Sequence, residues 1–513
     1  MDRLPPELIN IISSHLEPPL AGYAALSRRW QHAIEPRIFL EIKTDSDDAS
    51  FRQFQAAFST PRRRALLRWL SFRVQLPSPS LKRMRKLQSR REAATNSLVY
   101  TRALAALFSF LHTWEHHGNV WIGLDVTVSS PMDNYAGGDH DHMGDPIWTI
   151  RNKFRDLHFD ADALREAGGL ATAPVVSRFT IDSNYNRRIA PAIMPLLVKA
   201  LPNVRQMAWG FLALPRRMPD LRRVERMSLA NGLSLIASLN LPLLTSLRIY
   251  WDETDPFNEA FNLGSLLDPA SGRDDVSIAL RRISQLPSLR SLSLLGCHTV
   301  SAQLFEDDND DASTGNRVAS NWPSLTHLDL EMSVTTPDGR WYFTGDESNA
   351  EYAEEDVYDS DELAESPAAF DSADSDTSDY APADNWAKEE GMNGCFFRTA
   401  PDPATLVPFL ISMVRAVARM PVLRRLELSM ANLSGGPRLF AHYFGPGEPG
   451  NRSMAPSEQA FYDAHLCDPR WVLHLYGEWD AAWSIPPELR AALRETSGEG
   501  CVYVAKLRGY EQF

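Results

Sequence analysis

The stretch Leu286-Pro287-Ser288-Leu289-Arg290-Ser291-Leu292-Ser293-Leu294 decides the fold, because close copies of it recur from residue 201 onward. The copies share the pattern Leu/Met/Trp-Pro-x-Leu-x-x-Leu-x-Leu and occupy residues 201–209, 241–249, 322–330 and 420–428, with a degenerate copy at 218–224. The prolines of the first four clear copies are about 40 residues apart, and self-similarity at such a period predicts a repeat architecture.

Each copy predicts the end of a helix followed by a β-strand. Proline ends a helix, and Leu-x-Leu then alternates between the two faces of a sheet. Apolar helical stretches precede most copies, at 192–200, 276–286 and 406–420. Stacked units of this kind place parallel strands on one side and helices on the other. The sequence therefore predicts an α/β fold with a parallel sheet, and a non-repetitive α/β domain is the alternative.

The rest of the chain predicts the same alternation of helices and strands. We expect strands at 38–42, 66–76, 120–126, 154–159 and 175–181, and helices at 49–58 and 92–114. After a loop at 444–456, strands at 471–476 and 501–506 flank a helix at 486–494 and are expected to cap the array. The repeated units resemble an irregular leucine-rich repeat, which implies a solenoid of helix–strand units.

An acidic segment at 344–387 interrupts the array. Between Arg340 and Lys388 the chain has fifteen Asp or Glu and no Lys or Arg, so this segment accounts for the net charge of −14. Segments with so few large aliphatic side chains bury too little apolar area to offset the entropy cost of ordering. We expect a disordered insertion, with Glu306 to Asp311 as a smaller acidic loop.

The first residues predict a separate helical hairpin. Leu4-Pro5-Pro6-Glu7 is a helix start, because proline lacks the N–H that would be unpaired there. Apolar residues then recur at helical spacing at Leu8, Ile9, Ile12 and Leu16, and in a second helical stretch, about 20–34, at Leu26, Trp30 and Ile34. We expect Pro18-Pro19 to end the first helix and Pro36 the second. Roughly 40 residues bury too little surface to be stable alone, so the stripe needs a partner.

These residues resemble an F-box, the helical module by which substrate receptors bind the Skp adaptor of cullin-RING ubiquitin ligases. Residues 2–40 carry Leu-Pro-x-Glu-Leu-Ile-x-x-Ile-x-x-x-Leu and then Leu-Ser-Arg-Arg-Trp, a variant similar to F-box proteins of filamentous fungi. The resemblance implies an F-box at 1–37 and a substrate-binding repeat domain at 38–343 and 388–513. It also implies adaptor contacts by Leu4, Pro5, Leu8, Ile9, Ile12, Leu16, Leu26 and Trp30.

The cysteines and the hydrophobic runs restrict the class of protein further. Cys297, Cys395, Cys467 and Cys501 are far apart and form no CxxC pair, which favours free thiols in a reducing compartment over disulfides or a zinc site. The longest uncharged run, 227–247, contains Asn, Gly and Pro residues and is too polar and broken to cross a bilayer. We expect a cytoplasmic or nuclear protein with no cofactor and no membrane partner.

The sequence contains no recognisable catalytic motif, so we expect a protein that is not an enzyme. P-loop, Gly-x-Ser-x-Gly and His-Glu-x-x-His patterns are missing from the sequence. The His- and Asp-rich stretch 137–145 favours a polar loop over a metal site, and His116-His117 favours a helix end. Basic residues between Arg62 and Arg91 favour a solvated face over a nucleic-acid surface, so no nucleic-acid partner is expected.

Three functions remain open at this point. The first is a substrate receptor that binds the Skp adaptor through the hairpin and a target protein through the repeats, where no residue of this chain performs the ubiquitin transfer. The second is an interaction scaffold whose hairpin only caps the first repeat. The third is an enzyme with a dispersed active site, which leaves no local motif. Nothing in the sequence identifies the target protein.

Overall fold

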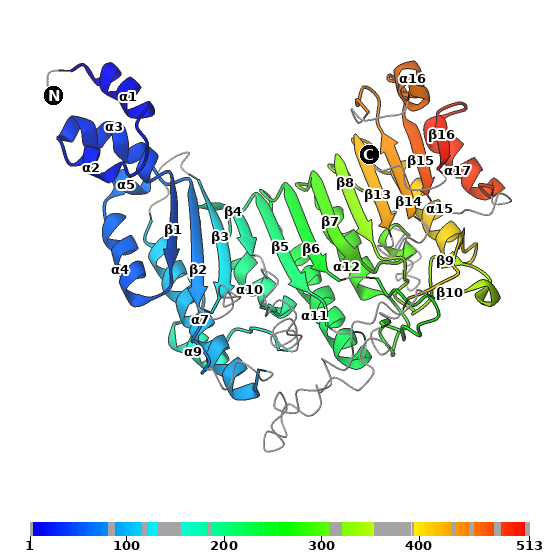
Figure 1. The fold of residues 1–513 in the computed structure, drawn as a ribbon, viewed down its shortest axis with the longest axis horizontal. Helices are drawn as coiled ribbons and strands as arrows, with labels where there is room; N and C mark the ends of the chain where they lie inside the picture. The colour runs from blue at the N-terminus through cyan, green and yellow to red at the C-terminus, as the bar shows by residue number, and fades with distance from the viewer. Residues whose placement is uncertain are drawn as a thin grey trace.

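The computed structural model of the chain describes residues 4–80, 88–114, 121–130, 155–181, 187–214, 216, 218–239, 241–253, 255–306, 321–352, 391, 394–431, 438–450, 456–476 and 484–507. These residues form an α/β protein with one large, mostly parallel twelve-stranded sheet whose strands alternate with helices. Figure 1 shows the strands side by side, nearly in chain order, with a helical module at the N-terminal end.

The sheet follows the order β1-β2-β3-β4-β5-β6-β7-β8-β13-β14-β15-β16. Its strands are β1 (Glu41–Asp45), β2 (Trp69–Gln75), β3 (Ile122–Ser129), β4 (Val176–Ile181), β5 (Gln206–Leu212), β6 (Ser246–Asp252), β7 (Ser291–His298), β8 (His327–Met332), β13 (Arg425–Ala431), β14 (Arg438–Phe444), β15 (Arg470–Tyr476) and β16 (Val502–Leu507). Pairing is parallel from β1 through β13, antiparallel at β13–β14 and β14–β15, and parallel again at β15–β16.

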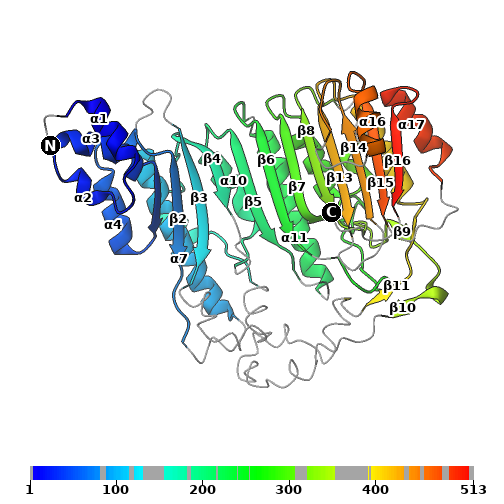
Figure 2. The same ribbon diagram turned by 45° about the horizontal axis from the view of Figure 1, so that its top comes forward.

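The described helices lie before the sheet and between its strands, and their labels run with gaps from α1 to α17. They are α1 (Pro6–Ser14), α2 (Ala21–Ala24), α3 (Arg28–Ile38), α4 (Asp48–Ala57), α5 (Pro61–Arg64), α7 (Arg90–His112), α9 (Ala161–Glu166), α10 (Met194–Lys199), α11 (Pro219–Ser238), α12 (Asp275–Ser284), α15 (Leu406–Val417), α16 (Pro456–Ala464) and α17 (Pro487–Ser497). Figure 2 shows α7, α10 and α11 behind the strands, on one side of the sheet.

The repeated leucines stand in register across the sheet. Leu292 of β7 pairs with Leu247 of β6 and with Leu328 of β8, which in turn pairs with Leu426 of β13. All four are buried. The backbone repeats as well, because a single carbonyl just before one strand accepts two N–H groups at the start of the next, as Arg290 does for Thr326 and His327. The leucine pattern therefore forms one continuous core on the helix-covered side.

Four expected elements differ from the structure. The strand expected at 38–42 begins only at Glu41, because Ile38 still belongs to α3. The degenerate copy at 218–224 begins helix α11 and forms no strand; Pro219 occupies its first position, where proline is well tolerated. The second N-terminal helix is divided into α2 and α3, because Ser27 is extended and its Oγ accepts the Trp30 N–H, starting a new helix. Pro36 lies inside α3 and does not end it. The strand expected at 154–159 is only a bridge between Leu157 and Ile189.

Two further expectations concern the C-terminal part. The sheet is mixed and not wholly parallel, because strand β14, which the sequence did not indicate, runs antiparallel to both neighbours. The segment expected to be disordered from 344 begins with ordered structure: β9 (Phe343–Thr344) pairs with β12 (Ala400–Pro401), and β10 (Glu351–Tyr352) with β11 (Cys395–Phe396). Residues 353–390 of the acidic segment lie outside the described residues.

None of the described helices combines the length and the apolar composition that crossing a membrane requires.

Candidate functional site

The three N-terminal helices form a small module with a core of its own. Ile9 of α1 packs with Trp30 and Ile34 of α3, and all three are buried. Partly buried apolar residues surround them: Leu4, Leu16, Leu20, Ala24, Ala33 and Ile38. This cluster is separate from the large core that continues from Phe54 to Leu493. We call residues 4–38 the helical module and the remainder the sheet body.

The predicted adaptor-binding residues divide into two groups. Ile9 and Trp30 face inward and hold the module together, and Leu4 and Leu16 are half-buried beside them. Pro5, Leu8, Ile12 and Leu26 are exposed. The structure therefore places only part of the predicted stripe on the surface.

On the outside of α1, Leu8, Ile11 and Ile12 form an apolar strip that we call the α1 ridge. Their exposed fractions are 45%, 56% and 39%, and their spacing of three and four residues places them on one helix face. Leu26 and Tyr23 are exposed beside α2. Ile11 and Tyr23 are not among the predicted adaptor-binding residues, although the three-residue step from Leu8 to Ile11 indicates that Ile11 shares the helix face of Leu8. Burying one such side chain in an interface would stabilise the complex by about 1.5–3 kcal/mol.

Polar contacts join the helical module to the sheet body. Glu35 at the end of α3 is nearly fully buried, and its carboxylate pairs with Arg62 at 2.9 Å and with Arg63 at 2.8 Å, both from α5. Although burial opposes it, hydrogen bonds from Gln31 and Arg63 and the charges of Arg62 and Arg63 lower the pKa of Glu35. The Arg63 guanidinium also lies over the Phe39 ring. One ionised carboxylate therefore fixes the module against the body.

The basic stretch that the sequence analysis considered for nucleic acid is largely engaged within the chain. Besides the Glu35 pairs, Arg64 donates to Phe58 O at 2.8 Å and Arg73 pairs with Asp45 at 2.6 Å. Residues 81–87 of this stretch, the predicted helix end at 116–117 and the predicted polar loop at 137–145 lie outside the described residues.

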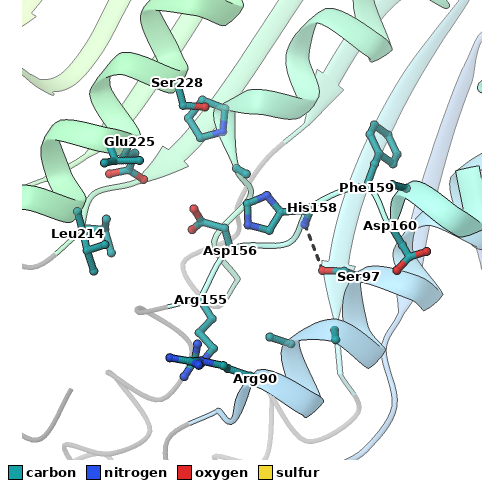
Figure 3. A pocket seen from close by; sticks show the side chains of 17 residues that line it. Arg90, Ser97, Arg155, Asp156, His158, Phe159, Asp160, Leu214, Glu225 and Ser228 are labelled. Atoms are coloured by element: carbon teal, nitrogen blue, oxygen red, sulfur yellow. Dashed lines mark hydrogen bonds between the residues drawn. The ribbon is translucent and has the colours of Figure 1, made fainter. Parts of the chain in front are cut away.

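A pocket of about 570 Å³ lies between α7, the 155–161 segment and α11 (Figure 3). Arg90 and Arg155 lie together on one side, and Asp156 and Glu225 lie on the other. The remaining lining is mostly apolar or small: Ala93, Ala94, Ser97, His158, Phe159, Asp160, Ala161, Ala190, Pro191, Leu214, Leu221, Val224 and Ser228. None of these residues is predicted as a site residue by the sequence, since they come from four distant segments.

A buried ionic group forms the carboxylate wall of this pocket. Arg188, 1% exposed, donates Nε to Asp156 at 2.7 Å and Nη2 to Glu225. Burial raises the pKa of Glu225 even though the Arg188 guanidinium opposes the rise. Similar pairs continue along α11: Arg222 pairs with Glu253, directly after β6, and Arg226 pairs with Asp274, directly before α12. The carboxyl edge of a parallel sheet is where α/β proteins place ligands.

The side of the sheet facing away from the helices carries three neighbouring carboxylates. Asp329 of β8 pairs in register with Glu427 of β13, and Glu331 follows on β8. Partial burial and the charges of Glu427 and Glu331 raise the pKa of Asp329 to about 6, although Arg248 and Arg425 oppose the rise. Residues on this side are polar because they alternate with the buried leucines.

None of the four cysteines forms a disulfide, as their spacing predicted. No protein family and no curated protein matches this chain. The resemblance of residues 2–40 to an F-box therefore depends on the quoted residues alone.

Proposed function

We propose that this protein is the substrate-receptor subunit of a Skp–cullin–F-box ubiquitin ligase. The observation that supports the proposal most directly is a helical module with its own core that turns the α1 ridge to solvent. Contiguous exposed apolar side chains, such as the three of this ridge, are typical of a surface that another protein covers. In this proposal Leu8, Ile11, Ile12 and Leu26 bind the Skp adaptor, while Ile9 and Trp30 maintain the module.

The sheet body would hold the target protein. We infer that the body is a leucine-rich-repeat-like solenoid, because the leucine ladder and the paired backbone contacts repeat from strand to strand. Its polar strand face and its loops are extended surfaces of the kind that such arrays use for binding. Ubiquitin transfer would then be accelerated by effective concentration, with no catalytic group supplied by this chain.

The test is binding of the full chain to a purified Skp adaptor, measured by calorimetry. We expect a complex, and we expect Leu8→Asp combined with Ile12→Asp to weaken it by at least about a hundredfold, because large apolar anchors dominate interface energies. Both side chains are substantially exposed, so the double variant should fold.

A matched control places the same two charges on the sheet body. Leu196 and Val422 are 40% and 44% exposed, and Leu196→Asp combined with Val422→Asp should leave adaptor binding unchanged. A stably folded wild-type chain that does not bind the adaptor would contradict the proposal and favour the scaffold alternative.

A second candidate function rests on the pocket beside α11, where two cationic side chains lie opposite two carboxylates. A buried carboxyl group with a raised pKa in a concave site is a candidate acid–base group. We infer that a small anionic ligand would bind toward Arg90 and Arg155, with Glu225 as the proton-handling group of an enzyme.

Ligand binding in this pocket is tested by filling the pocket with a larger side chain. Val224→Trp, at a pocket-lining position that is 63% exposed, should abolish any ligand-induced thermal stabilisation found in a screen of anionic metabolites. Leu235→Trp on the same helix, 53% exposed and outside the pocket lining, is the control. If no anion stabilises the wild type, the enzyme alternative is wrong.

A further inference from the structure

Three possible metal ligands meet at the C-terminal end of the sheet. Cys501 Sγ lies 3.5 Å from His465 Nδ1, and this nitrogen lies 3.7 Å from Asp468 Oδ2. All three donor atoms are within 4.8 Å of one another. His465 follows α16, Asp468 precedes β15, and Cys501 precedes β16, the last strand of the sheet (Figure 1).

A glycine-containing turn and a buried arginine side chain hold these ligands in place. Gly498 and Gly500 both have positive φ, at 90° and 83°, so the turn after α17 brings Cys501 back beside His465. Arg470, which is fully buried, donates to the carbonyls of His465 and Asp468, each at 3.3 Å. The loop that presents the imidazole and the carboxylate is therefore organised before any ion binds.

Two of the three separations, sulfur to nitrogen and nitrogen to oxygen, suit a tetrahedral ion; the third, from Cys501 Sγ to the Asp468 carboxylate, is within 4.8 Å. Zinc binds thiolate sulfur at ~2.3 Å and imidazole nitrogen or carboxylate oxygen at ~2.0–2.2 Å, which places tetrahedral ligand atoms about 3.3–3.6 Å apart. The observed 3.5 Å between sulfur and nitrogen falls in this range, and the 3.7 Å between nitrogen and oxygen is slightly longer. Asp468 is the most exposed of the three, so a fourth position can be taken by water.

We propose that His465, Asp468 and Cys501 form a binding site for zinc or a similar thiophilic divalent ion. On binding, the Cys501 thiol loses its proton to solvent, Sγ forms a bond to the metal, and a water molecule completes the coordination. The thiolate and the carboxylate together balance the charge of a divalent ion. The bound ion would join the α16–β15 loop to the start of β16 and so hold the edge strand of the sheet.

The test uses the full chain with Zn²⁺ and Co²⁺ alone as probes. We expect one tightly bound zinc per chain after dialysis, a rise in melting temperature with zinc, and a thiolate-to-cobalt charge-transfer band with Co²⁺. Cys501→Ser should weaken zinc binding at least tenfold and remove the charge-transfer band. Asp468→Asn, at a more exposed position, should weaken zinc binding while the protein remains folded.

Cys467→Ser is the matched control, because this exposed thiol is adjacent to Asp468 but is not one of the three ligands. It should keep both the zinc affinity and the cobalt band. A wild-type chain that binds no zinc at micromolar concentration would overturn the proposal. So would unchanged affinity in both Cys501→Ser and Asp468→Asn.

Discussion

The helical module and the sheet body are stabilised in different ways. The body has a large apolar core that joins every strand of the sheet from β2 to β15, with a small second cluster of Phe444, Tyr462 and Val472. The apolar residues that the module buries are Ile9, Trp30 and Ile34, in a cluster of their own. A core this small offsets little of the entropy cost of ordering its chain. We therefore expect the body to fold by itself, and the module to depend on its contact with the body and, in our proposal, on a partner.

The largest expected effect comes from removing one tryptophan from each core. Trp209, 1% exposed, packs between Phe179 and Phe211 in the body. Trp209→Ala should destabilise the body by about 3–5 kcal/mol, the usual cost of a large aromatic cavity. Trp30→Ala should unfold the module and abolish adaptor binding while the main thermal transition of the body stays in place.

Calorimetry and hydrogen exchange of residues 4–38 distinguish these outcomes. If Trp30→Ala lowered the temperature of the main transition as much as Trp209→Ala does, the two cores would form one cooperative unit, and the module would not be stabilised separately from the body.

Acid should weaken the body through a buried histidine, His298, at the end of β7. This side chain is 5% exposed, and its Nε2 lies 3.0 Å from Ile249 O. Burial lowers the pKa of His298 to about 4. A histidine with a lowered pKa stabilises the fold above its unfolded pKa of about 6.5, and this stability is lost as pH falls toward 4, up to about 3 kcal/mol.

Unfolding by urea at pH 7.5, 6 and 4.5 checks this dependence. His298→Gln should be less stable at pH 7.5 but should lose less stability than the wild type on acidification. Equal losses in both proteins would show that His298 does not control the acid response.

The contact between module and body should be weakened by one uncharged substitution. Glu35→Gln keeps the size of the side chain but removes the charge that pairs with Arg62 and Arg63. We expect a loss of about 1–2 kcal/mol, because hydrogen bonds to a charged group are stronger than neutral ones. Faster proteolytic cleavage near residues 36–41, with an unchanged main transition, is the expected readout.

Asp45→Asn gives the comparison for an exposed ion pair. Asp45 pairs with Arg73, whose side chain is 51% exposed, and such pairs contribute only about 0–1 kcal/mol. If Asp45→Asn accelerated the same cleavage as much as Glu35→Gln, the burial of Glu35 would not be what fixes the module.

The repeat pattern predicted strands β5, β6, β7, β8 and β13, because proline and alternating leucines impose the same local geometry in every clear copy. The pattern also misplaced residues 218–224, since proline followed by leucine suits a helix start as well as a helix end. Strand β14 was missed because its sequence mixes aromatic, histidine and arginine residues without a leucine alternation.

The candidate sites were harder to predict from the sequence. Helical spacing predicted an apolar face on α1, but it did not tell which side faces Trp30 and which faces solvent, since Leu8 and Ile9 are adjacent. The three possible metal ligands are up to 36 residues apart, and the pocket beside α11 combines four distant segments. Only the tertiary structure brings such residues together.

The smallest expected effect concerns the charged face of the body, in contrast to the apolar α1 ridge. Asp329 and Glu427 are direct neighbours on β8 and β13, and the pKa of Asp329 is raised to about 6. A raised carboxyl pKa means that the folded state binds the proton more tightly, so stability falls as pH rises from about 4 to 6. Asp329→Asn should therefore stabilise the protein by ~0.2–1 kcal/mol at pH 7, as relief of opposed like charges does, and hardly at all at pH 4. Glu41→Gln, which changes an exposed carboxylate on β1, is the control and should leave the stability unchanged at both pH 7 and pH 4. If Asp329→Asn instead destabilised the protein at pH 7, the arginines beside Asp329 would outweigh its acidic neighbours.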